Sequence, residues 1–446
     1  MKIVLNVTKS IVPKFVLLVF FIIILIVVIA YARGYRINFD EGTVSSTGIL
    51  SINSTPKPGR VYVNGQLKGA TDVNLTLPFG RYTVEVKKDG YTSWTKSISL
   101  KGEIVMSLEA RLFSKNPSLT PLTNLGVIKA IPMGNTDKLI LISQTGDAEK
   151  DGVYLFEAGN KPLAIFPPLK PLLMKSVLGE NIDLTTATID FSPNYRQGVM
   201  ITFTTDAGEI AYLIQLDDEN TEPFEITASK NNVLTAWNDE KNIEALKIIE
   251  TLPKKFVPIA VSSFQIISLS QDEKKLLYLA KSDADLPVVI NPPLIGTNQT
   301  QEHRNIKKGS LYIYDKKEDK NFLLPVTLTI DESLFIPPAT KEEITPTPET
   351  ATSTASVTVT PRVWNEALVR LVMEKVQWYP TSDYIALMDT NQIKLMQYDG
   401  TNEEIVYAGP LQDHFYTISP DWNLLVLINL NPKVNDSGDL YSVGIK

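Results

Sequence analysis

Ile418-Ser-Pro-Asp-Trp422, followed by the apolar run Leu424-Leu-Val-Leu-Ile428, has related copies earlier in the chain, from residue 191 onward. Each copy combines an aromatic or aliphatic residue, a tight turn of Ser, Pro and Asp-type residues, and an apolar run that predicts a buried strand. The other copies begin at Phe191, Leu269 and Trp378. The turns of the last two copies are 40 residues apart, and those of the first two are 78 apart, close to twice that spacing. A period near 40 with several short strands per unit is typical of a β-propeller.

These turns resemble the Ser-Pro-Asp-Gly repeats of TolB-like propellers. Residues 391–404 fit the next hairpin of such a blade, with a turn at Asp399-Gly400, and Asp439-Leu-Tyr-Ser-Val-Gly-Ile445 fits a final strand that closes the ring. The resemblance implies a TolB-like propeller of five to seven blades over residues 114–446. Its first blade, at about 124–160, is weakly patterned.

A shorter block, residues 48–112, alternates apolar and polar residues as half-buried strands do. The alternating apolar positions are Val61, Val63, Tyr82, Val84, Val86, Trp94, Ile98, Leu100, Ile104, Met106 and Leu108. Turn sequences separate them at Asn64-Gly65, Pro78-Phe-Gly80 and Asp89-Gly90. The block predicts a small antiparallel β-sandwich of five to seven strands, so the fold class is all-β.

The same block resembles the PEGA domain family. The resemblance rests on Gly59-Arg-Val-Tyr-Val-Asn-Gly65, on Leu77-Pro-Phe-Gly-Arg-Tyr-Thr-Val-Glu-Val86 and on Lys88-Asp-Gly-Tyr91. The sequence departs from the family at Pro58-Gly59-Arg60, with Lys57 inserted, and at Phe79. PEGA domains resemble surface-layer modules of exported proteins, which implies a β spacer or adhesion unit. Anchor, PEGA domain and degenerate propeller together resemble proteins of candidate-phyla bacteria.

The N-terminal segment contains an uninterrupted apolar run, Phe15–Tyr31. A helix of this length reaches about 25 Å, close to the thickness of a hydrocarbon core. We expect a cytoplasmic N-terminus at 1–14, a transmembrane anchor at 15–32, and a polar stalk at 33–47, with the rest of the chain beyond the membrane. The alternative is a cleaved signal peptide, for which Ala30-Tyr-Ala32 offers a small-x-small site.

Composition narrows the function. The 446 residues contain no cysteine, which excludes disulfides and thiol chemistry. A formal charge of −7 argues against a nucleic-acid partner.

Two insertions interrupt the repeat: residues 239–252 predict an amphipathic helix, packed on the ring or binding a partner, and residues 337–361 predict a disordered Thr/Pro-rich loop. Residues 283–308 predict a second, better ordered loop.

Candidate chemistry is sparse. His303 and His414 are the only histidines, and both fall in predicted loops. The densest carboxylates, Asp217-Asp-Glu219 and Glu403-Glu404, fall in predicted turns, where solvation is favoured over acid–base or calcium chemistry. Trp94, Trp364, Trp378 and Trp422 could stack on sugars, but core packing is favoured for the two at blade turns. Nucleophile-elbow and phosphate-loop motifs are absent from the sequence.

We therefore expect no catalytic, cofactor-binding or metal-binding residues. The sequence favours a non-enzymatic, membrane-anchored envelope protein whose propeller docks protein or cell-wall glycan. Two alternatives remain: a glycan- or peptide-cleaving propeller enzyme that uses carboxylates in its channel, and a passive structural spacer.

Overall fold

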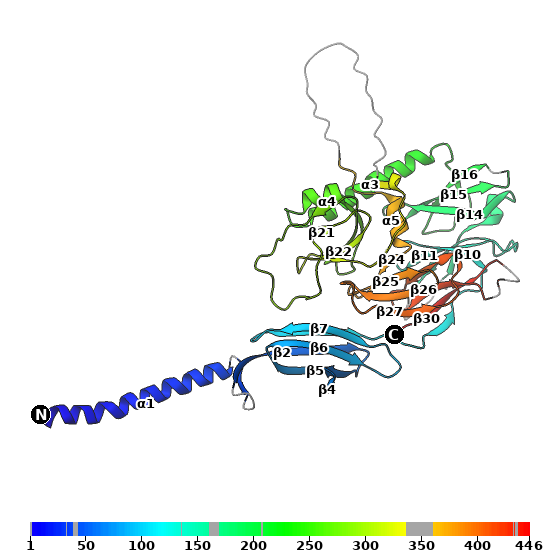
Figure 1. The fold of residues 1–446 in the computed structure, drawn as a ribbon. Helices are drawn as coiled ribbons and strands as arrows, with labels where there is room; N and C mark the ends of the chain where they lie inside the picture. Colours follow the sequence, from blue (N-terminus) through cyan, green and yellow to red (C-terminus); the bar gives the residue numbers. More distant parts are fainter. Residues whose placement is uncertain are drawn as a thin grey trace, which may run out of the picture. The chain divides into compact units, whose positions relative to one another are not determined.

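The computed structural model describes residues 2–32, 34–38, 43–134, 136–159, 169–206, 208–335, 360–430, 432 and 436–446. It consists of two units: unit 1 comprises residues 1–113 and 292–299, and unit 2 comprises residues 114–291 and 300–446. The described residues are mostly strands, arranged in several small sheets (Figure 1). The loop expected at 337–361 lies outside the described residues except at its last two positions.

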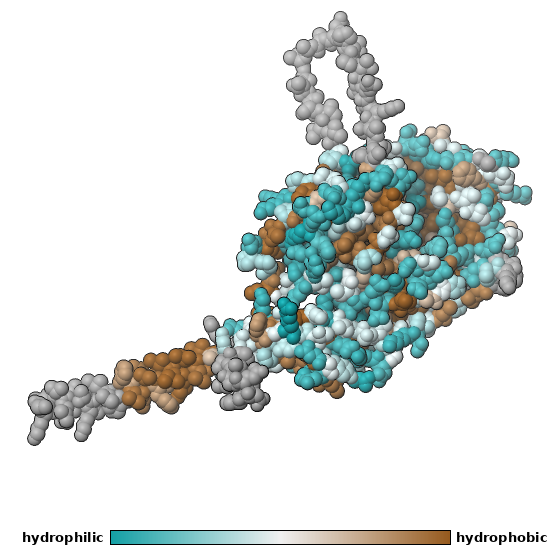
Figure 2. All heavy atoms as spheres, in the orientation of Figure 1, coloured by the Kyte–Doolittle hydropathy of each residue, from teal (hydrophilic) through white to brown (hydrophobic). Residues whose placement is uncertain are grey.

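Unit 1 begins with one long helix, α1 (Lys2–Ala32). Its segment Lys14–Ala32 is long and apolar enough to cross a membrane, and none of it is buried by protein. Figure 2 shows apolar side chains along this part of the helix. Length and composition fit a membrane anchor and a signal sequence equally.

A sandwich of two four-stranded sheets follows. One sheet contains β1 (Tyr35–Asn38), β2 (Thr43–Thr55), β5 (Val73–Pro78) and β8 (Val105–Arg111). The other contains β3 (Arg60–Val63), β4 (Gln66–Ala70), β6 (Gly80–Lys87) and β7 (Trp94–Leu100). The alternating positions predicted from the sequence form its core, which includes Val61, Val84, Val86, Trp94 and Leu100. Segment 292–299 belongs to this unit, and its Gln299 side chain hydrogen-bonds the Ser99 backbone.

The sandwich corrects two expectations. Its described residues form eight strands, and β8 pairs with β2 in parallel, whereas we expected five to seven antiparallel strands. The alternation of apolar residues sets which face a strand buries, but not the direction of its neighbour, and β8 returns from a strand of the other sheet. The expected stalk at 33–47 contains β1 and the first residues of β2, which pair with each other.

The described residues of unit 2 form five sheets of four strands each. The first sheet contains β10 (Val127–Pro132), β11 (Lys138–Ser143), β12 (Gly152–Glu157) and β13 (Leu169–Met174). The second contains β14 (Ile182–Phe191), β15 (Gln197–Thr204), β16 (Glu209–Gln215) and β17 (Phe224–Glu225). The third contains β18 (Phe264–Leu269), β19 (Lys275–Ala280), β22 (Leu311–Asp315) and β23 (Lys320–Leu323). The last two are β24–β27 (Val376–Trp378, Tyr384–Asp389, Gln392–Gln397, Glu404–Ala408) and β28–β30 (Tyr416–Ile418, Leu424–Ile428, Asp439–Gly444) with β9 (Ser118–Pro121). The short pair β20 (Ala284–Asp285) and β21 (Asn305–Ile306) lies in the loop at 283–308.

The repeated turns hold the same position in four of these sheets, between the first strand and the second. In each turn the fourth residue donates its backbone N–H to the carbonyl of the first and has a positive φ. These fourth residues are Tyr195, Glu273, Ser382 and Trp422. The shared geometry explains the repeat found in the sequence. The hairpin expected at 391–404 and the strand expected at 439–445 correspond to β26–β27 and β30.

Apolar clusters join several pairs of these sheets. One cluster joins β10–β13 to β14–β17, a second joins β10–β13 to β28–β30, and a third joins the β18 sheet to the β24 sheet. Between the β24 and β28 sheets, the Gln377 amide donates to the Tyr416 carbonyl at 3.0 Å, and the Tyr416 hydroxyl donates to the Ala386 carbonyl at 3.1 Å.

Helix α3 (Lys230–Glu250) connects the second and third sheets, and with α4 (Val257–Ser263) and α5 (Glu366–Met373) it covers their packing faces (Figure 1). The remaining helices are the short α2 (Lys175–Leu178), η1 (Glu332–Phe335) and η2 (Gln412–His414).

The helix expected at 239–252 begins nine residues earlier, at Lys230, and ends at Glu250. Its two halves pack differently: Val233, Leu234 and Trp237 contact the β14–β17 sheet, whereas Ala245 and Ile249 contact the cluster around β18. A search for a single apolar stripe therefore detects only the second half.

Candidate functional site

A cavity of about 290 Å³ lies in unit 2 where β14, α3 and α5 meet. Its lining residues are Asp190, Phe191, Leu234, Trp237, Asn238, Lys241, Glu366, Ala367 and Arg370. The volume lies at the small end of the range for ligand pockets. The lining combines an indole and apolar side chains with two cations, two carboxylates and an amide.

Ion pairs connect the three elements across the cavity. Arg370 of α5 lies 2.5 Å from the Asp190 carboxylate of β14, measured from Nη2 to Oδ1. Lys241 of α3 lies 2.9 Å from Oε2 of Glu366 on α5, and the Lys241 side chain is only 13% exposed. The second oxygen of Glu366 lies 3.9 Å from Arg370. The four charges sum to zero, so the cavity presents alternating donors and acceptors without a net charge.

A buried amide fixes the two helices relative to each other. Asn242 of α3 accepts hydrogen bonds from the backbone N–H groups of Val363 (2.8 Å) and Trp364 (3.1 Å), and donates to the Pro361 carbonyl at 3.0 Å. Asn365 then caps α5, because its side chain accepts from Ala367 N and Leu368 N. The cavity wall is therefore held by contacts that do not involve the lining charges.

The aromatic side of the cavity continues into the core. Phe191 packs at 6.0 Å from Tyr195, between ring centroids. Burial, and then the carboxylates of Glu366 and Glu244, raise the pKa of Tyr195. Its hydroxyl thus remains protonated at neutral pH and offers a neutral donor near Glu366.

The carboxylates singled out from the sequence lie elsewhere. Asp217, Asp218 and Glu219 are exposed in the loop between β16 and β17, and Asp218 pairs with Lys170 at 3.4 Å. Glu403 pairs with Lys394 at 3.0 Å, beside the start of β27. Within the described part of the chain, groups of three or more His, Asp or Glu side chains that could hold a metal ion do not occur.

The histidines and tryptophans are dispersed. His414 is exposed at the end of η2, and His303 is half-buried in the loop before β21. Trp94 lies in the sandwich core and Trp378 packs in the third cluster. The Trp364 indole donates to Glu366 at 3.1 Å, next to the cavity, and Trp422 is exposed under the Lys446 ammonium at 5.8 Å.

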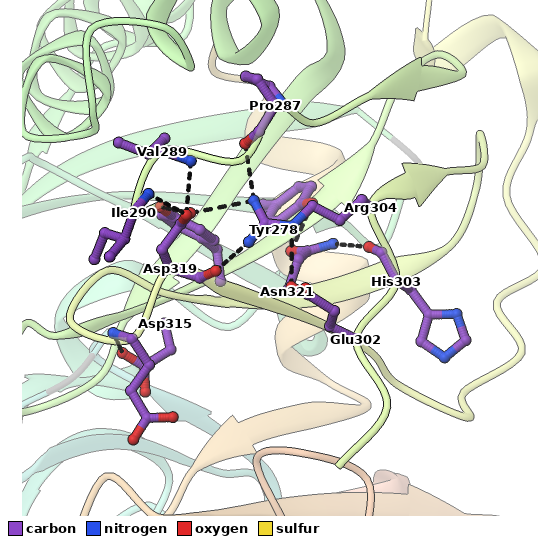
Figure 3. A network of polar contacts seen from close by, with 12 residues as sticks. Tyr278, Pro287, Val289, Ile290, Glu302, His303, Arg304, Asp315, Asp319 and Asn321 are labelled. Atoms are coloured by element: carbon purple, nitrogen blue, oxygen red, sulfur yellow. Dashed lines mark hydrogen bonds and ion pairs between the residues drawn. The ribbon is translucent and has the colours of Figure 1, made fainter. Parts of the chain in front are cut away.

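A second polar cluster surrounds Asp319 (Figure 3). Its carboxylate accepts from Val289 N (2.7 Å), Ile290 N (2.9 Å), the Tyr314 hydroxyl (2.9 Å) and Arg304 Nη1 (3.2 Å). Burial opposes ionisation of Asp319, but these bonds outweigh it and lower its pKa. The His303 imidazole points away from the carboxylate in Figure 3. The bonds from Val289, Ile290 and Arg304 pin the loop at 286–306 to the β22–β23 turn, and the Tyr314 bond ties that turn to β22, so this cluster is structural.

Sequence reasoning missed the cavity residues. Trp237 is the one tryptophan that was not among the candidates for sugar stacking, because the predicted helix began two residues after it. Glu366 and Arg370 are four residues apart on α5, but Asp190 and Lys241 lie far from them in the sequence, and no spacing rule connects the three elements. A usable signal was Asn365-Glu366 before the apolar run of 367–373, a helix-capping pattern that predicts α5.

The turn between β18 and β19 contains Asp272, a carboxylate whose pKa can be tested by titration. Burial would raise the pKa of Asp272, but hydrogen bonds from the Ser270 hydroxyl (2.7 Å) and Lys274 N (3.2 Å), with the charge of Lys275, lower it to about 2. Because this folded value lies below the unfolded value of about 3.9, the carboxylate stabilises the fold above about pH 4. That contribution is lost as the pH falls towards 2.

Ser270→Ala is expected to raise the pKa of Asp272 towards its unfolded value, measured by a carboxyl NMR titration. Ser192→Ala, in the equivalent turn, removes a hydroxyl that bonds an amide at Asn194, and serves as the control. An unchanged Asp272 titration in Ser270→Ala would contradict the assigned cause.

Comparison with known families identifies the sandwich. The described molecule is a mostly β protein with an N-terminal apolar helix, and its residues 47–116 match the PEGA domain family. The sandwich after α1 is therefore a PEGA domain, as the sequence resemblance implied. A comparison with curated proteins gives no match.

Solved structures give distant neighbours. TolB from Acinetobacter baumannii aligns at 8% identity and a TM-score of 0.23, over 82% of this chain and 60% of TolB. The chain thus spans less than two thirds of that neighbour. A putative 6-phosphogluconolactonase from Bacteroides uniformis aligns at 10% identity and a TM-score of 0.17, over 82% of this chain and 88% of its own. An auxiliary nutrient binding protein from Bacteroides ovatus aligns at 9% identity and a TM-score of 0.18, over 89% of this chain and 81% of that protein. TM-scores of this size carry no argument about the fold.

Proposed function

We propose that this chain is a membrane-anchored, extracytoplasmic, non-enzymatic binding protein. Its PEGA domain follows the anchor, and the five sheets of unit 2 close into a five-bladed propeller that captures a cell-envelope glycan. The single observation that carries the proposal is the lining of the cavity between β14, α3 and α5, which combines Trp237 with paired charges and an amide.

The order of the sheets supports a ring. Three sheets are meanders of consecutive strands, a fourth is a meander into which the β20–β21 pair is inserted, and the fifth takes its outer strand, β9, from the beginning of the unit. Joining the first and last segments in one sheet leaves fewer open sheet edges. The apolar clusters, the helices α3 and α5 between the second and third sheets, and the Gln377 and Tyr416 hydrogen bonds between the last two supply the packing that such a ring needs.

The apolar helix supports an anchor. A run without charges over Phe15–Tyr31 satisfies its own backbone hydrogen bonds and can remain in the bilayer. The slight excess of cations before it favours a cytoplasmic N-terminus. The folded units would then lie outside the cell membrane.

The cavity chemistry supports a saccharide. Sugar hydroxyls both donate and accept hydrogen bonds, and alternating carboxylates, cations and an amide can satisfy both roles. The apolar face of a pyranose ring packs on an indole such as Trp237. The small volume suits one sugar unit at the end or in the bend of a chain, rather than a folded protein.

The pairing of the carboxylates supports binding rather than cleavage. Glycoside hydrolysis needs one carboxylic acid to donate its proton and a second carboxylate to act as base or nucleophile. Asp190 and Glu366 each pair with a cation, at 2.5 Å and 2.9 Å, so their oxygens are engaged in structural contacts. The rival enzyme hypothesis is thereby less supported at this cavity.

Trp237→Ala is expected to weaken binding to insoluble peptidoglycan or to a glycan array by about ten-fold, since one stacked aromatic contributes on the order of 1 kcal/mol beyond its buried area. Full-length protein in detergent is used, and Trp422→Ala, an exposed tryptophan outside the cavity, is the matched control. Equal binding by both variants would overturn the site. Retention of an envelope protein instead would favour protein docking, turnover of a glycan would favour the enzyme, and no binding at all would favour a spacer.

A further inference from the structure

We propose that the end of the PEGA sandwich nearest α1 rests on the membrane surface, with Phe79 inserted among the lipid head groups beside Tyr31 and Tyr35. The inference rests on the proposed anchor and goes beyond it, because it assigns a lipid-binding surface to the folded domain. It concerns unit 1 alone.

The connection between helix and sandwich is very short. Helix α1 ends at Ala32, and Gly34 N donates to the Tyr31 carbonyl at 3.1 Å. The Gly34 carbonyl then accepts two hydrogen bonds from Thr47 of β2, from N at 2.9 Å and from Oγ1 at 2.7 Å. The first residues of the sandwich sheet are thereby tied to the last turn of the helix.

Gly34 is required at this joint. Its φ of +88° lies in the left-handed region, and an added Cβ would lie 3.1 Å from Thr47 Oγ1 and 3.2 Å from the Thr47 carbonyl. Other residues would meet both backbone strain and crowding there. The joint therefore holds the sandwich within one or two residues of the bilayer boundary.

The strand register places Phe79 at the same end. Tyr35 of β1 lies opposite Ser46 of β2, and Phe79 N donates to the Ser46 carbonyl at 3.0 Å from the other side. Because neighbouring strands are about 4.8 Å apart, Tyr35 and Phe79 are separated by about 10 Å. Both residues lie at the end of the sheet where the chain enters it from α1.

These aromatic side chains are exposed. Phe79 is 63% exposed, Tyr31 64% and Tyr35 39%. Aromatic residues concentrate at the membrane–water interface, where head groups form a layer about 5–8 Å deep on each side of the hydrocarbon core. The apolar segment of α1 ends at these three aromatic residues, so a lipid surface is the occupant that the geometry favours over a protein.

A labelling experiment tests the inference. The chain has no cysteine, so single-cysteine variants carry one environment-sensitive fluorophore each. Phe79→Cys is compared with Leu67→Cys in the full-length protein, reconstituted in vesicles that contain lipids with a nitroxide at the head group. Leu67 is the matched control because it is 59% exposed and lies opposite Tyr62, which pairs with Glu85. Glu85 is five residues beyond Gly80 along β6, a distance of about 17 Å.

The label at residue 79 is expected to be quenched at least several-fold more than the label at residue 67. Equal quenching at the two positions, or quenching only at 67, would overturn the inference. A third variant, Phe21→Cys within α1, separates this outcome from failure of the anchor. Its label should be quenched by lipids that carry the nitroxide deep in the acyl chain, and without that quenching both the anchor and the inference fail.

Discussion

Asp319→Ala is expected to lower the free energy of unfolding of unit 2 by about 3–5 kcal/mol, the usual cost of removing one partner from a buried ion pair. The Asp319 side chain is only 3% exposed and that of Arg304 is 17% exposed, so the guanidinium would remain largely buried without its carboxylate. The N–H groups of Val289 and Ile290 would lose their acceptor as well. The loop at 286–306 is expected to detach first.

Urea unfolding of the full-length protein in detergent, followed by tryptophan fluorescence, measures the change. Asp331→Ala is the control, because Asp331 is exposed and accepts from Ser333 N at 2.9 Å. It is expected to cost less than about 1 kcal/mol. A loss below about 1 kcal/mol in Asp319→Ala would show that solvent or a rearranged loop replaces the carboxylate.

Local patterns predicted the strands well. The parity of Val61, Val84 and Trp94 identified the buried face of the sandwich, because side chains in a strand alternate between its faces. The Ser-Pro-Asp turns located the beginning of four sheets, because a residue with positive φ and a serine hydroxyl constrain the chain within five residues. Such features depend on neighbours in the sequence.

Pairing across long distances was not predictable in the same way. The parallel pairing of β8 with β2 depends on where the chain crosses between sheets, and the alternation of its residues is the same for either direction. The cavity joins Asp190 to Arg370, 180 positions later in the chain. Contacts between residues so far apart cannot be predicted from a single sequence. Trp237 was missed for a different reason, because only the second half of its helix was predicted.

Removing residues 438–446 is expected to unfold all five sheets of unit 2. These residues contain β30, which lies between β29 and β9, and Leu440 and Val443 of this strand and Ile445 just after it are almost completely buried. Each such side chain contributes about 1.5–3 kcal/mol, and the sum is comparable with the total stability of a domain, about 5–15 kcal/mol. The Asp439 carboxylate also accepts from Thr123 Oγ1 (2.9 Å) and Leu125 N (2.8 Å), which ties the two ends of unit 2 together.

Limited proteolysis distinguishes a closed ring from independent sheets. In a closed ring each sheet packs on two neighbours, so loss of the sheet that contains β30 exposes the cluster shared with β10–β13, removes the Gln377 and Tyr416 hydrogen bonds to the β24 sheet, and spreads around the ring. The sandwich has its own core and is expected to survive as a protected fragment that ends near Phe113. Removing only the exposed Lys446 is the control, which is expected to change stability by at most about 1 kcal/mol through its contact with Trp422. Protection of β10–β27 in the longer truncation would contradict the ring, because it would mean that the sheets are stable without closure.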